Sequence, residues 1–419
     1  MAEDRLLANF VHRAWLVNSP LDVITTSYVD SLRTQRYADG TIRDLLSALA
    51  HFAHWMKVKE ISISEIEEGL FDRFVHSHLR HCRCPAPCCY DVKRSCSALN
   101  HLLRVLRQEG LFHAPRTRPT PVSVEVDRFA QHLRDTCGLA LSTSRQRTKY
   151  AREFLDRQFG KGPVKFSRLK PSDVDQYFVA NAGRWSVRSL GVIRDCLASY
   201  FRFRAFLGYR SESLRAALPV IANWAQATLP KGLTNAQLEV LLQSFDLTDP
   251  LGRRDYAIAR CMIDLGLRRS EVVHLRLESF NWREGTITID GGKGRRTRRL
   301  PLPVLTGKAV ARYLRNGRPT TRNRHLFVRH HAPFDKPLGS GAICSVICSA
   351  YARCGLRDQF AGTHVLRHGH AMRLQRSGAS LKEIADLLGH EDLDATKIYA
   401  KVDLEGLRAV ALPWPGSGR

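Results

Sequence analysis

Two stretches of the chain, Asp22 to Phe112 and Val124 to Tyr209, carry helical patterns in the same order. Each opens with a helical pattern around Leu-Arg, continues into an amphipathic helix rich in aromatic residues, passes a short Asp-x-aromatic segment and closes with a helix near a cysteine. An internal duplication of an all-helical unit is the economical explanation, although any two four-helix segments align loosely. The matching pairs are Leu32-Arg33 and Leu133-Arg134, Leu45–Met56 and Tyr150–Phe159, Asp72-Arg73-Phe74 and Asp175-Gln176-Tyr177, and Cys96 and Cys196.

The connecting segments fit this division. Residues 113–122 hold three prolines and two arginines without apolar periodicity, which is typical of an extended basic connector. A second boundary falls near Leu229, after which Thr234 is a candidate N-cap for a new helix. We therefore predict an N-terminal helical domain over residues 1–112, a linker over 113–123, a second helical domain over 124–228 and a C-terminal domain over 229–419.

The pattern changes in the C-terminal domain. Residues Thr286 to Ile289 alternate at period two, a glycine-rich turn follows, and Arg298 to Leu302 return as a second strand. This predicts a β-hairpin among helices expected near 253–265, 269–277 with Ser270 as N-cap, 309–314, 340–354, 364–377, 381–388 and 395–399. The predicted fold class is mainly α with a small antiparallel β-hairpin in an α+β C-terminal domain.

The charge balance points to a polyanionic partner. The chain carries 65 Lys and Arg against 40 Asp and Glu, a net charge of +25. A GC-rich genome would explain the preference for Arg over Lys but not the excess of positive charge, so we expect nucleic-acid binding. Because the sequence shows neither a long apolar run nor a secretory signal at Met1 to Phe10, we expect a cytoplasmic, nucleoid-associated protein without membrane contact.

Six residues of the C-terminal domain suit phosphodiester transfer without a metal or cofactor. Two arginines can neutralise the charge that develops on the non-bridging oxygens, because each planar fork bonds two oxygens at once. A tyrosine phenol can attack phosphorus, a lysine on a hairpin can protonate the departing 5′ oxygen, and two histidines can move protons or hold the phosphate. The six are Arg268, Lys293, His364, Arg367, His390 and Tyr399.

The order and spacing of these residues resemble those of the tyrosine recombinases, or phage integrase family. The boxes that carry the resemblance are Gly266-Leu267-Arg268, Gly292-Lys293-Gly294, His364-Val365-Leu366-Arg367, Leu388-Gly389-His390 and Thr396-Lys397-Ile398-Tyr399. The resemblance implies a tyrosine-recombinase catalytic domain, a core-binding (SAM-like) domain over 124–228 and Tyr399 as the nucleophile that forms a 3′-phosphotyrosine. It also implies that Glu271 supports the first catalytic arginine.

Further basic residues near this set are expected to contact DNA. A run of like charge on a strand is otherwise destabilising, which favours contacts from Arg295, Arg296, Arg298 and Arg299 to the DNA backbone. Arg269 stands where an apolar residue is expected after the first arginine, and it can add a phosphate contact. His368 and His370 are expected to be packing or solvent residues.

The N-terminal domain extends beyond the two-domain plan of the family. It can be an arm-type DNA-binding domain, a protein-interaction domain or an extension of the clamp around DNA, and the duplication favours the clamp. It also holds a cluster of cysteines and histidines, namely His76, His78, His81, Cys82, Cys84, Cys88 and Cys89. We expect unbound thiols and no metal there; the alternative is structural zinc held by ligands from Cys82, Cys84, Cys88 and Cys89.

The sequence therefore predicts a site-specific DNA recombinase or integrase of a mobile element, active in transposition or integration. The resemblance implies homo- or hetero-tetramers on double-stranded DNA, with the apolar tail at Asp403 to Pro413 packing either on a neighbouring subunit or on its own domain. A type IB-like topoisomerase and a catalytically inactive DNA-binding regulator remain as alternatives.

Overall fold

The computed structural model describes residues 13–85, 88–112, 119–221, 231–291 and 297–390, together with Thr396 and Ile398. Lys293, Arg295, Arg296 and Tyr399 therefore lie outside the described residues, as do the helix expected at 395–399, except for Thr396 and Ile398, and the apolar tail. The chain divides into two compact units, one of residues 116–229 and one that joins residues 1–115 with residues 230–419. Within the described residues, every helix is too short or too polar to cross a membrane.

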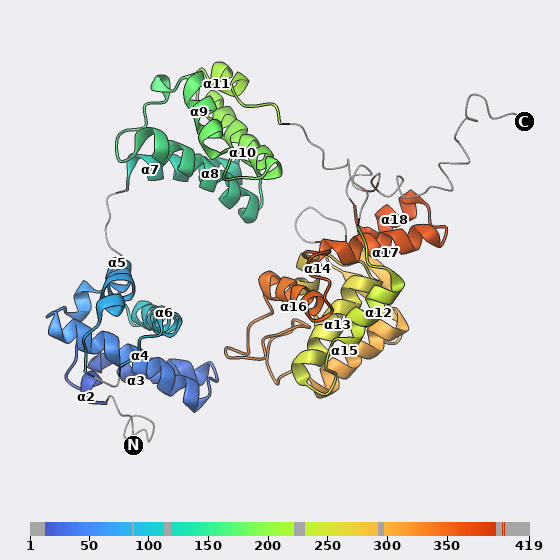
Figure 1. Cartoon of the computed structure of the whole chain (residues 1–419), viewed down its shortest axis with the longest axis horizontal. Coiled ribbons are helices and arrows are strands. Elements are labelled where there is room, and N and C mark those ends of the chain that lie inside the picture. Colours follow the sequence, from blue (N-terminus) through green and yellow to red (C-terminus); the bar gives the residue numbers. More distant parts are fainter. Residues whose placement is uncertain are drawn as a thin grey trace, which may run out of the picture. The chain divides into compact units, whose positions relative to one another are not determined.

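The N-terminal part of the first unit is helical (Figure 1). Its helices enclose one apolar core. The elements are α2 (Arg13–Leu16), α3 (Asp22–Thr34), α4 (Asp39–Val58), α5 (Glu68–Asp72), the π-helical turn η2 (Arg73–His78) and α6 (Val92–Gln108). Helix α4 is the central element, since eleven of its side chains are buried and it packs on α6. Asp91 begins α6 by accepting hydrogen bonds from the Lys93 and Arg94 amides, as N-cap aspartates do.

The second unit is also helical and has its own core. Its elements are α7 (Pro121–Asp135), α8 (Leu141–Phe159), α9 (Pro171–Asn181), α10 (Val187–Phe206) and α11 (Glu212–Ala216). In this core the buried Arg204 and Glu125 form an ion pair at 2.7 Å, and the Tyr200 hydroxyl donates to the same carboxylate at 2.9 Å. Mutual pairing lets these charged groups occupy the interior.

The order of helices in α3 to α6 corresponds to that in α7 to α10. In both parts two long helices precede a shorter helical segment, and a long helix closes the set. This correspondence supports the duplication suggested by the sequence, which stays a prediction.

The C-terminal part of the first unit starts with α12 (Asn235–Gln243) and α13 (Pro250–Asp264). Thr234 is the N-cap of α12, as predicted, and accepts a hydrogen bond from the Gln237 amide at 3.2 Å. Asp249 caps α13, and Pro250 occupies the first helical position, where its missing N–H costs nothing. These caps fix where α13 begins and, through its length, where the turn at Gly266 falls.

A three-stranded antiparallel sheet follows the short helix α14 (Arg269–His274). Its strands are β1 (Phe280–Asn281), β2 (Thr286–Ile289) and β3 (Arg298–Pro301), in the order β1-β2-β3. The predicted hairpin is confirmed as β2 and β3, with Ile287 opposite Leu300 and Ile289 opposite Arg298. Strand β1 was not predicted, because two residues are too few to show a period.

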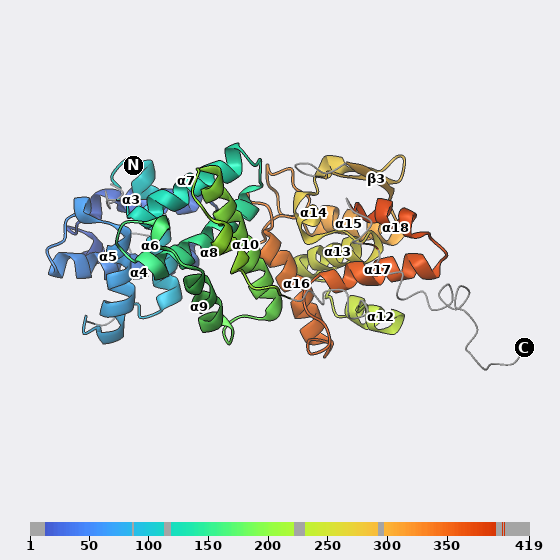
Figure 2. The same cartoon turned by 90° about the horizontal axis from the view of Figure 1, so that it is seen from above.

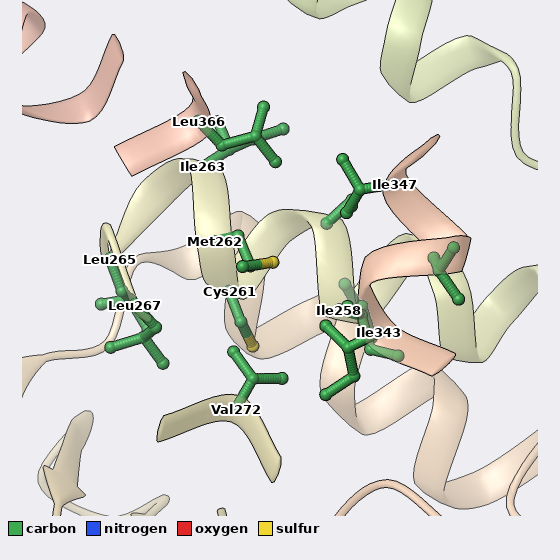
Figure 3. Packing of buried hydrophobic residues seen from close by; sticks show 14 of the residues in the cluster. Ile258, Cys261, Met262, Ile263, Leu265, Leu267, Val272, Ile343, Ile347 and Leu366 are labelled. Atoms are coloured by element: carbon green, nitrogen blue, oxygen red, sulfur yellow. The ribbon is translucent and has the colours of Figure 1, made fainter. Parts of the chain in front are cut away.

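Four helices complete this part: α15 (Val304–Asn316), α16 (Ser340–Arg353), α17 (His364–Arg376) and α18 (Leu381–Leu388). Helix α13 supports the first three of these helices, and α18 packs on α17. Figure 3 shows the α13 side chains Ile258, Cys261, Met262 and Ile263 packed among Ile343 and Ile347 of α16, Leu366 of α17 and Val272 of α14. Helix α18 lies beside α17 in both views (Figures 1 and 2).

Candidate active site

Three arginines from distant parts of the sequence converge on one carboxylate, that of Glu271. Arg268 lies just before α14, Arg298 begins β3 and Arg367 lies in the first turn of α17. Their guanidinium nitrogens reach Glu271 at 3.0, 3.0 and 4.0 Å, and the Glu271 side chain is only 5% exposed. One negative charge thus holds three positive charges in place, so the cluster keeps a positive excess suited to an anion.

The first turn of α14 explains why Glu271 and Arg268 meet. The Arg268 backbone N–H donates to Glu271 Oε2 at 2.8 Å, and its Nη1 donates to Oε1 at 3.0 Å. The glutamate thus caps the helix start at Arg268. The predicted N-cap Ser270 is wrong, because Ser270 already lies inside α14 and Arg268 precedes the first helical residue.

Arg298 makes the closest two-pronged contact with Glu271. Its Nη1 and Nη2 donate to Oε1 and Oε2 at 3.1 and 3.0 Å, and its Nε donates to the Leu387 carbonyl at 3.0 Å. Its side chain is 11% exposed. This geometry favours a bracing role that joins the hairpin to α14 and α18, rather than the predicted contact with the DNA backbone.

Burial on its own would raise the pKa of Glu271, but its partners reverse the direction. Hydrogen bonds and charge from Arg298, the backbone N–H of Arg268 and the charge of Arg367 together hold the pKa of Glu271 below its ordinary value. Glu271 therefore stays ionised and keeps its grip on the arginines at neutral pH.

Backbone carbonyls at two left-handed glycines orient Arg367 and Arg268. The Gly266 carbonyl accepts from Arg367 Nη1 at 2.7 Å, and the Gly389 carbonyl accepts from Arg268 Nη2 at 3.0 Å. The Leu388 carbonyl accepts from Arg367 Nη2 at 2.6 Å and from Arg268 Nη1 at 3.3 Å. Gly266 and Gly389 have φ of +60° and +63°, a conformation that favours glycine.

Steric crowding, in addition to the positive φ, favours glycine at positions 266 and 389. A Cβ on Gly389 would lie 2.7 Å from Arg298 Nη1, and a Cβ on Gly266 would lie 2.7 Å from both the His370 ring and a Leu388 methyl. The turn after α13 therefore packs against His370 and Leu388, and the turn after α18 packs against Arg298.

Four histidines lie around the cluster. His364 is exposed at the start of α17, one turn before the partly buried His368, and their ring centroids are 6.4 Å apart. His390 follows Gly389 and its Nδ1 forms a 2.6 Å hydrogen bond with the Thr396 hydroxyl. Burial, followed by the charges of Arg367 and Arg268, lowers the pKa of His390 to about 4. Burial also lowers the pKa of His370, to about 4, consistent with the packing role expected for that residue.

Two residues of the predicted nucleophile segment are described, and both are anchored. Thr396 is 1% exposed and holds His390, while Ile398 packs against a small core of Ala371, Met372, Ile384 and Leu388. Ile398 is the residue directly before Tyr399. The role of Thr396 was missed in the sequence, because a hydroxyl six residues after a histidine gives no recognisable signal.

The remaining basic residues differ in their surroundings. Arg269 is exposed at the start of α14. Arg299 is exposed on β3, where its Nε donates to the Thr286 hydroxyl at 3.0 Å and its Nη2 pairs with Glu284. Both side chains are accessible to a polyanion.

The candidate metal ligands lie in the N-terminal part of the first unit. Cys82 and Cys84 gather with His78, which belongs to the cluster noted in the sequence, and with His51, which does not, and the four ligand atoms lie within 4.8 Å of one another. Cys88 and Cys89 are outside this group. All eleven cysteines belong to the described residues and are free thiols.

Comparison with known proteins shows which family the chain resembles. The profile of the phage integrase family matches residues 231–405. A putative integrase/recombinase of Sinorhizobium fredii, y4rA, is 32% identical over 96% of both chains. The tyrosine recombinase XerD of Ralstonia nicotianae is 31% identical over 71% of this chain and 96% of its own length.

Solved structures share the fold. XerH bound to a palindromic difH substrate has a TM-score of 0.55 at 17% identity, over 71% of this chain and 98% of that chain. The Tn1549 transposon integrase with circular intermediate DNA has a TM-score of 0.52 at 18% identity, over 68% and 98%. With a relative 32% identical along nearly the whole sequence, the chain belongs to the phage integrase family, the tyrosine recombinases.

Proposed function

We propose that this tyrosine recombinase is a site-specific DNA recombinase or integrase that cuts and rejoins DNA through a 3′-phosphotyrosine on Tyr399. The observation that carries the proposal is the cluster of Arg268, Arg298 and Arg367 around the single carboxylate of Glu271. A pocket with an excess of fixed positive charge is what the transition state of phosphoryl transfer requires.

The arginines of this cluster differ in exposure, and we assign them different roles. The Arg268 side chain is 21% exposed and that of Arg367 only 6%, so Arg268 is the more accessible to a phosphate. Arg367 donates to the carbonyls of Gly266 and Leu388. It therefore adds positive charge to the cluster and holds the turns at Gly266 and Gly389 in place. Arg298 and Glu271 are positioning residues that act through the other two arginines.

The chemistry follows from the remaining residues. The Tyr399 oxygen attacks phosphorus, and the bond from phosphorus to the 5′ oxygen breaks while Lys293 supplies the proton of the new 5′ hydroxyl. His364 and His390 hold the phosphate or carry the phenolic proton. A 5′ hydroxyl of the partner strand then attacks the phosphotyrosine, which restores the phosphodiester and releases Tyr399.

Anchoring near His390 supports the assignment of the nucleophile segment. Thr396 is hydrogen-bonded to His390, whose neighbour Gly389 holds Arg268. Ile398 is packed on α17 and α18. These contacts tie residues just before Tyr399 in the sequence to the same turn that positions the arginines.

We propose that residues 1–112 and 124–228 are two DNA-clamping domains joined by the linker 113–123, and that residues 229–419 form the catalytic domain. Separate apolar cores in these parts support the division. The exposed Arg145 and Lys149 of α8, with Arg269 and Arg299 of the catalytic domain, are the accessible basic residues that we assign to the DNA backbone. Arg295 and Arg296 are assigned to the same contact.

The proposed reaction also implies the number of subunits that act together on DNA. Exchange between two duplexes needs four active sites, so we propose a homo- or hetero-tetramer on double-stranded DNA, located at the nucleoid. The relative named integrase/recombinase supports a mobile element as the substrate.

A plasmid with two target sites tests the function. The target is first selected by binding the protein to a pool of random duplexes. A recombinase converts the two-site plasmid into deletion or inversion products, whereas a one-site plasmid stays unchanged. Relaxed circles without junction products from the two-site plasmid would instead identify a topoisomerase, and intact supercoiled DNA in every sample would contradict strand transfer.

A further inference from the structure

A closed group of four metal-ligand side chains lies outside the proposed active site. His51 comes from the middle of α4, His78 ends the π-helical turn η2, and Cys82 and Cys84 lie in the loop that follows. Their ligand atoms, two imidazole nitrogens and two sulfurs, all lie within 4.8 Å of one another. Two nitrogens and two thiolates form a donor set that is common in structural zinc sites.

The distances between these atoms match the edges of a zinc tetrahedron. His51 Nε2 lies 3.2 Å from His78 Nε2 and 3.2 Å from Cys82 Sγ, and Cys84 Sγ lies 3.6 Å from His78 Nε2. Zinc bonds of about 2.0 Å to nitrogen and 2.3 Å to sulfur at tetrahedral angles give edges of about 3.3 Å between nitrogens and about 3.5 Å between nitrogen and sulfur. Three of the six edges therefore already lie within about 0.3 Å of the length that zinc imposes.

Surrounding groups prepare these atoms for a cation. The Nδ1–H of His51 donates to the Cys89 carbonyl at 2.9 Å, and since a carbonyl only accepts, the tautomer leaves the Nε2 lone pair of His51 facing the group. The Cys84 amide lies 3.4 Å from Cys82 Sγ, the amide-to-sulfur contact that stabilises a thiolate. Orientation by hydrogen bonds from outside the ligand set is typical of metal-bound histidines.

Two aromatic rings pack against the histidines of this four-ligand group. The Phe74 ring lies 5.2 Å from His51 and 5.3 Å from His78, and the Trp55 ring lies 5.7 Å from His78. His51 itself is 0% exposed. Two thiolates would balance a divalent cation, so the occupied site is neutral and can be buried against these rings.

We propose that His51, His78, Cys82 and Cys84 bind one structural Zn²⁺ ion, which fastens the loop between η2 and α6 to helix α4. Binding releases the two thiol protons, and no electron transfer is involved. With four protein ligands the site is closed, which makes its role structural rather than catalytic. The proposal replaces the expectation of unbound thiols, and histidines of α4 and η2 replace Cys88 and Cys89 as ligands.

Metal analysis of the full-length protein, purified without a histidine tag, tests the site directly. The wild type is expected to hold about one equivalent of zinc after dialysis against a weak chelator. Cys82→Ser and Cys84→Ser should each lose it, while the matched control Cys88→Ser should keep it, because Cys88 lies in the same loop outside the ligand set. Less than about a tenth of an equivalent in the wild type, or equal loss in Cys88→Ser, would overturn the proposal.

Two measurements remain decisive if a variant fails to fold. X-ray absorption of the zinc-loaded wild type should show two sulfurs at about 2.3 Å and two nitrogens at about 2.0 Å. Trypsin should cut after the exposed Arg83, between the two cysteines, about tenfold faster once a strong chelator removes the metal, and added Zn²⁺ alone should restore protection. Oxygen-only coordination, a Cys82–Cys84 disulfide in the purified protein, or cleavage unaffected by chelator would each contradict the site.

Discussion

Arg298, at the start of the hairpin strand β3, grips both carboxylate oxygens of Glu271 with its two terminal nitrogens, at 3.1 and 3.0 Å. Glu271 in turn holds Arg268, the more accessible of the two arginines assigned to the phosphate. A residue of the hairpin is thereby joined to the catalytic arginines through one buried carboxylate.

Removing the contact between Arg298 and Glu271 should lower both the stability of the fold and the rate of DNA cleavage. Arg298→Leu leaves Glu271 buried with fewer partners, and we expect it to lower the free energy of unfolding by about 3 kcal/mol and to slow DNA cleavage. Urea denaturation measures the first effect and cleavage of the selected duplex the second. The matched control is Arg299→Leu on the same strand, whose exposed ion pair should contribute no more than about 1 kcal/mol. Equal losses of the free energy of unfolding in both variants would refute the bracing role.

Replacing Gly389 with alanine should be worse than its backbone conformation alone explains. Gly285 has a φ of +61°, nearly that of Gly389, but a Cβ there meets nothing within 4 Å. Gly285→Ala should therefore cost about 1–2 kcal/mol for the left-handed conformation, whereas Gly389→Ala also displaces Arg298. Thermal unfolding should show the larger loss for Gly389→Ala, with a matching loss of cleavage. The same cost for both variants would mean that Arg298 yields freely.

The family resemblance predicted Arg268 and Arg367 and the support of Arg268 by Glu271, but the sequence did not predict that Arg298 holds the same carboxylate. Ordered spacing indicated Arg268 and Arg367, while period-two alternation indicated β2 and the glycine-rich turn after it indicated β3, because these are local patterns. Arg298 was expected at the DNA because a run of like charge on a strand is destabilising unless a polyanion compensates it. Its partner Glu271 lies 27 residues earlier, and only the tertiary fold brings the two together.

Two further features were missed, the first through a local contact and the second through a tertiary one. Ser270 is a good N-cap by residue type, yet Arg268 precedes the helix because Glu271 folds back to its amide. His51 lies 27 residues before His78, so no short sequence motif links it to the cysteines. The four-ligand group forms only when helix α4 packs beside the loop that carries Cys82 and Cys84.

The pKa of His390 should be measurably low in the free protein. It is lowered to about 4 by burial, then by Arg367, Arg268, His368 and Arg298. Since the folded value lies below the unfolded one, the neutral ring stabilises the fold above pH 6.5, and this contribution is lost as pH falls from 6.5 towards 4. NMR titration of histidine-labelled protein should show His390 neutral at pH 6, and Arg268→Gln should raise its pKa. A His390 that titrates near 6.5 in the wild type would contradict the geometry.

Contacts with the DNA backbone should appear in the salt dependence of binding. Arg269→Gln and Arg299→Gln should each weaken binding to any sequence and reduce the slope of log K against log salt by about 0.9 for each phosphate that is no longer neutralised. Fluorescence anisotropy over a salt series measures this slope. Arg312→Gln, an exposed arginine on α15, serves as the control and should leave the slope unchanged. An unchanged slope in the first two variants would remove those residues from the interface.

The central claim is that Tyr399 becomes covalently joined to DNA. The direct measurement uses a nicked duplex that carries the selected target, since the nick lets the short 5′ strand diffuse away and traps the intermediate. Wild-type protein should give an adduct that resists denaturing electrophoresis and that peptide mapping places on Tyr399 through a 3′ phosphate. Tyr209→Phe, which alters an exposed tyrosine of the second unit, should form it equally well, and Tyr399→Phe should form none. No adduct from the wild type, or an undiminished one from Tyr399→Phe, would contradict the account.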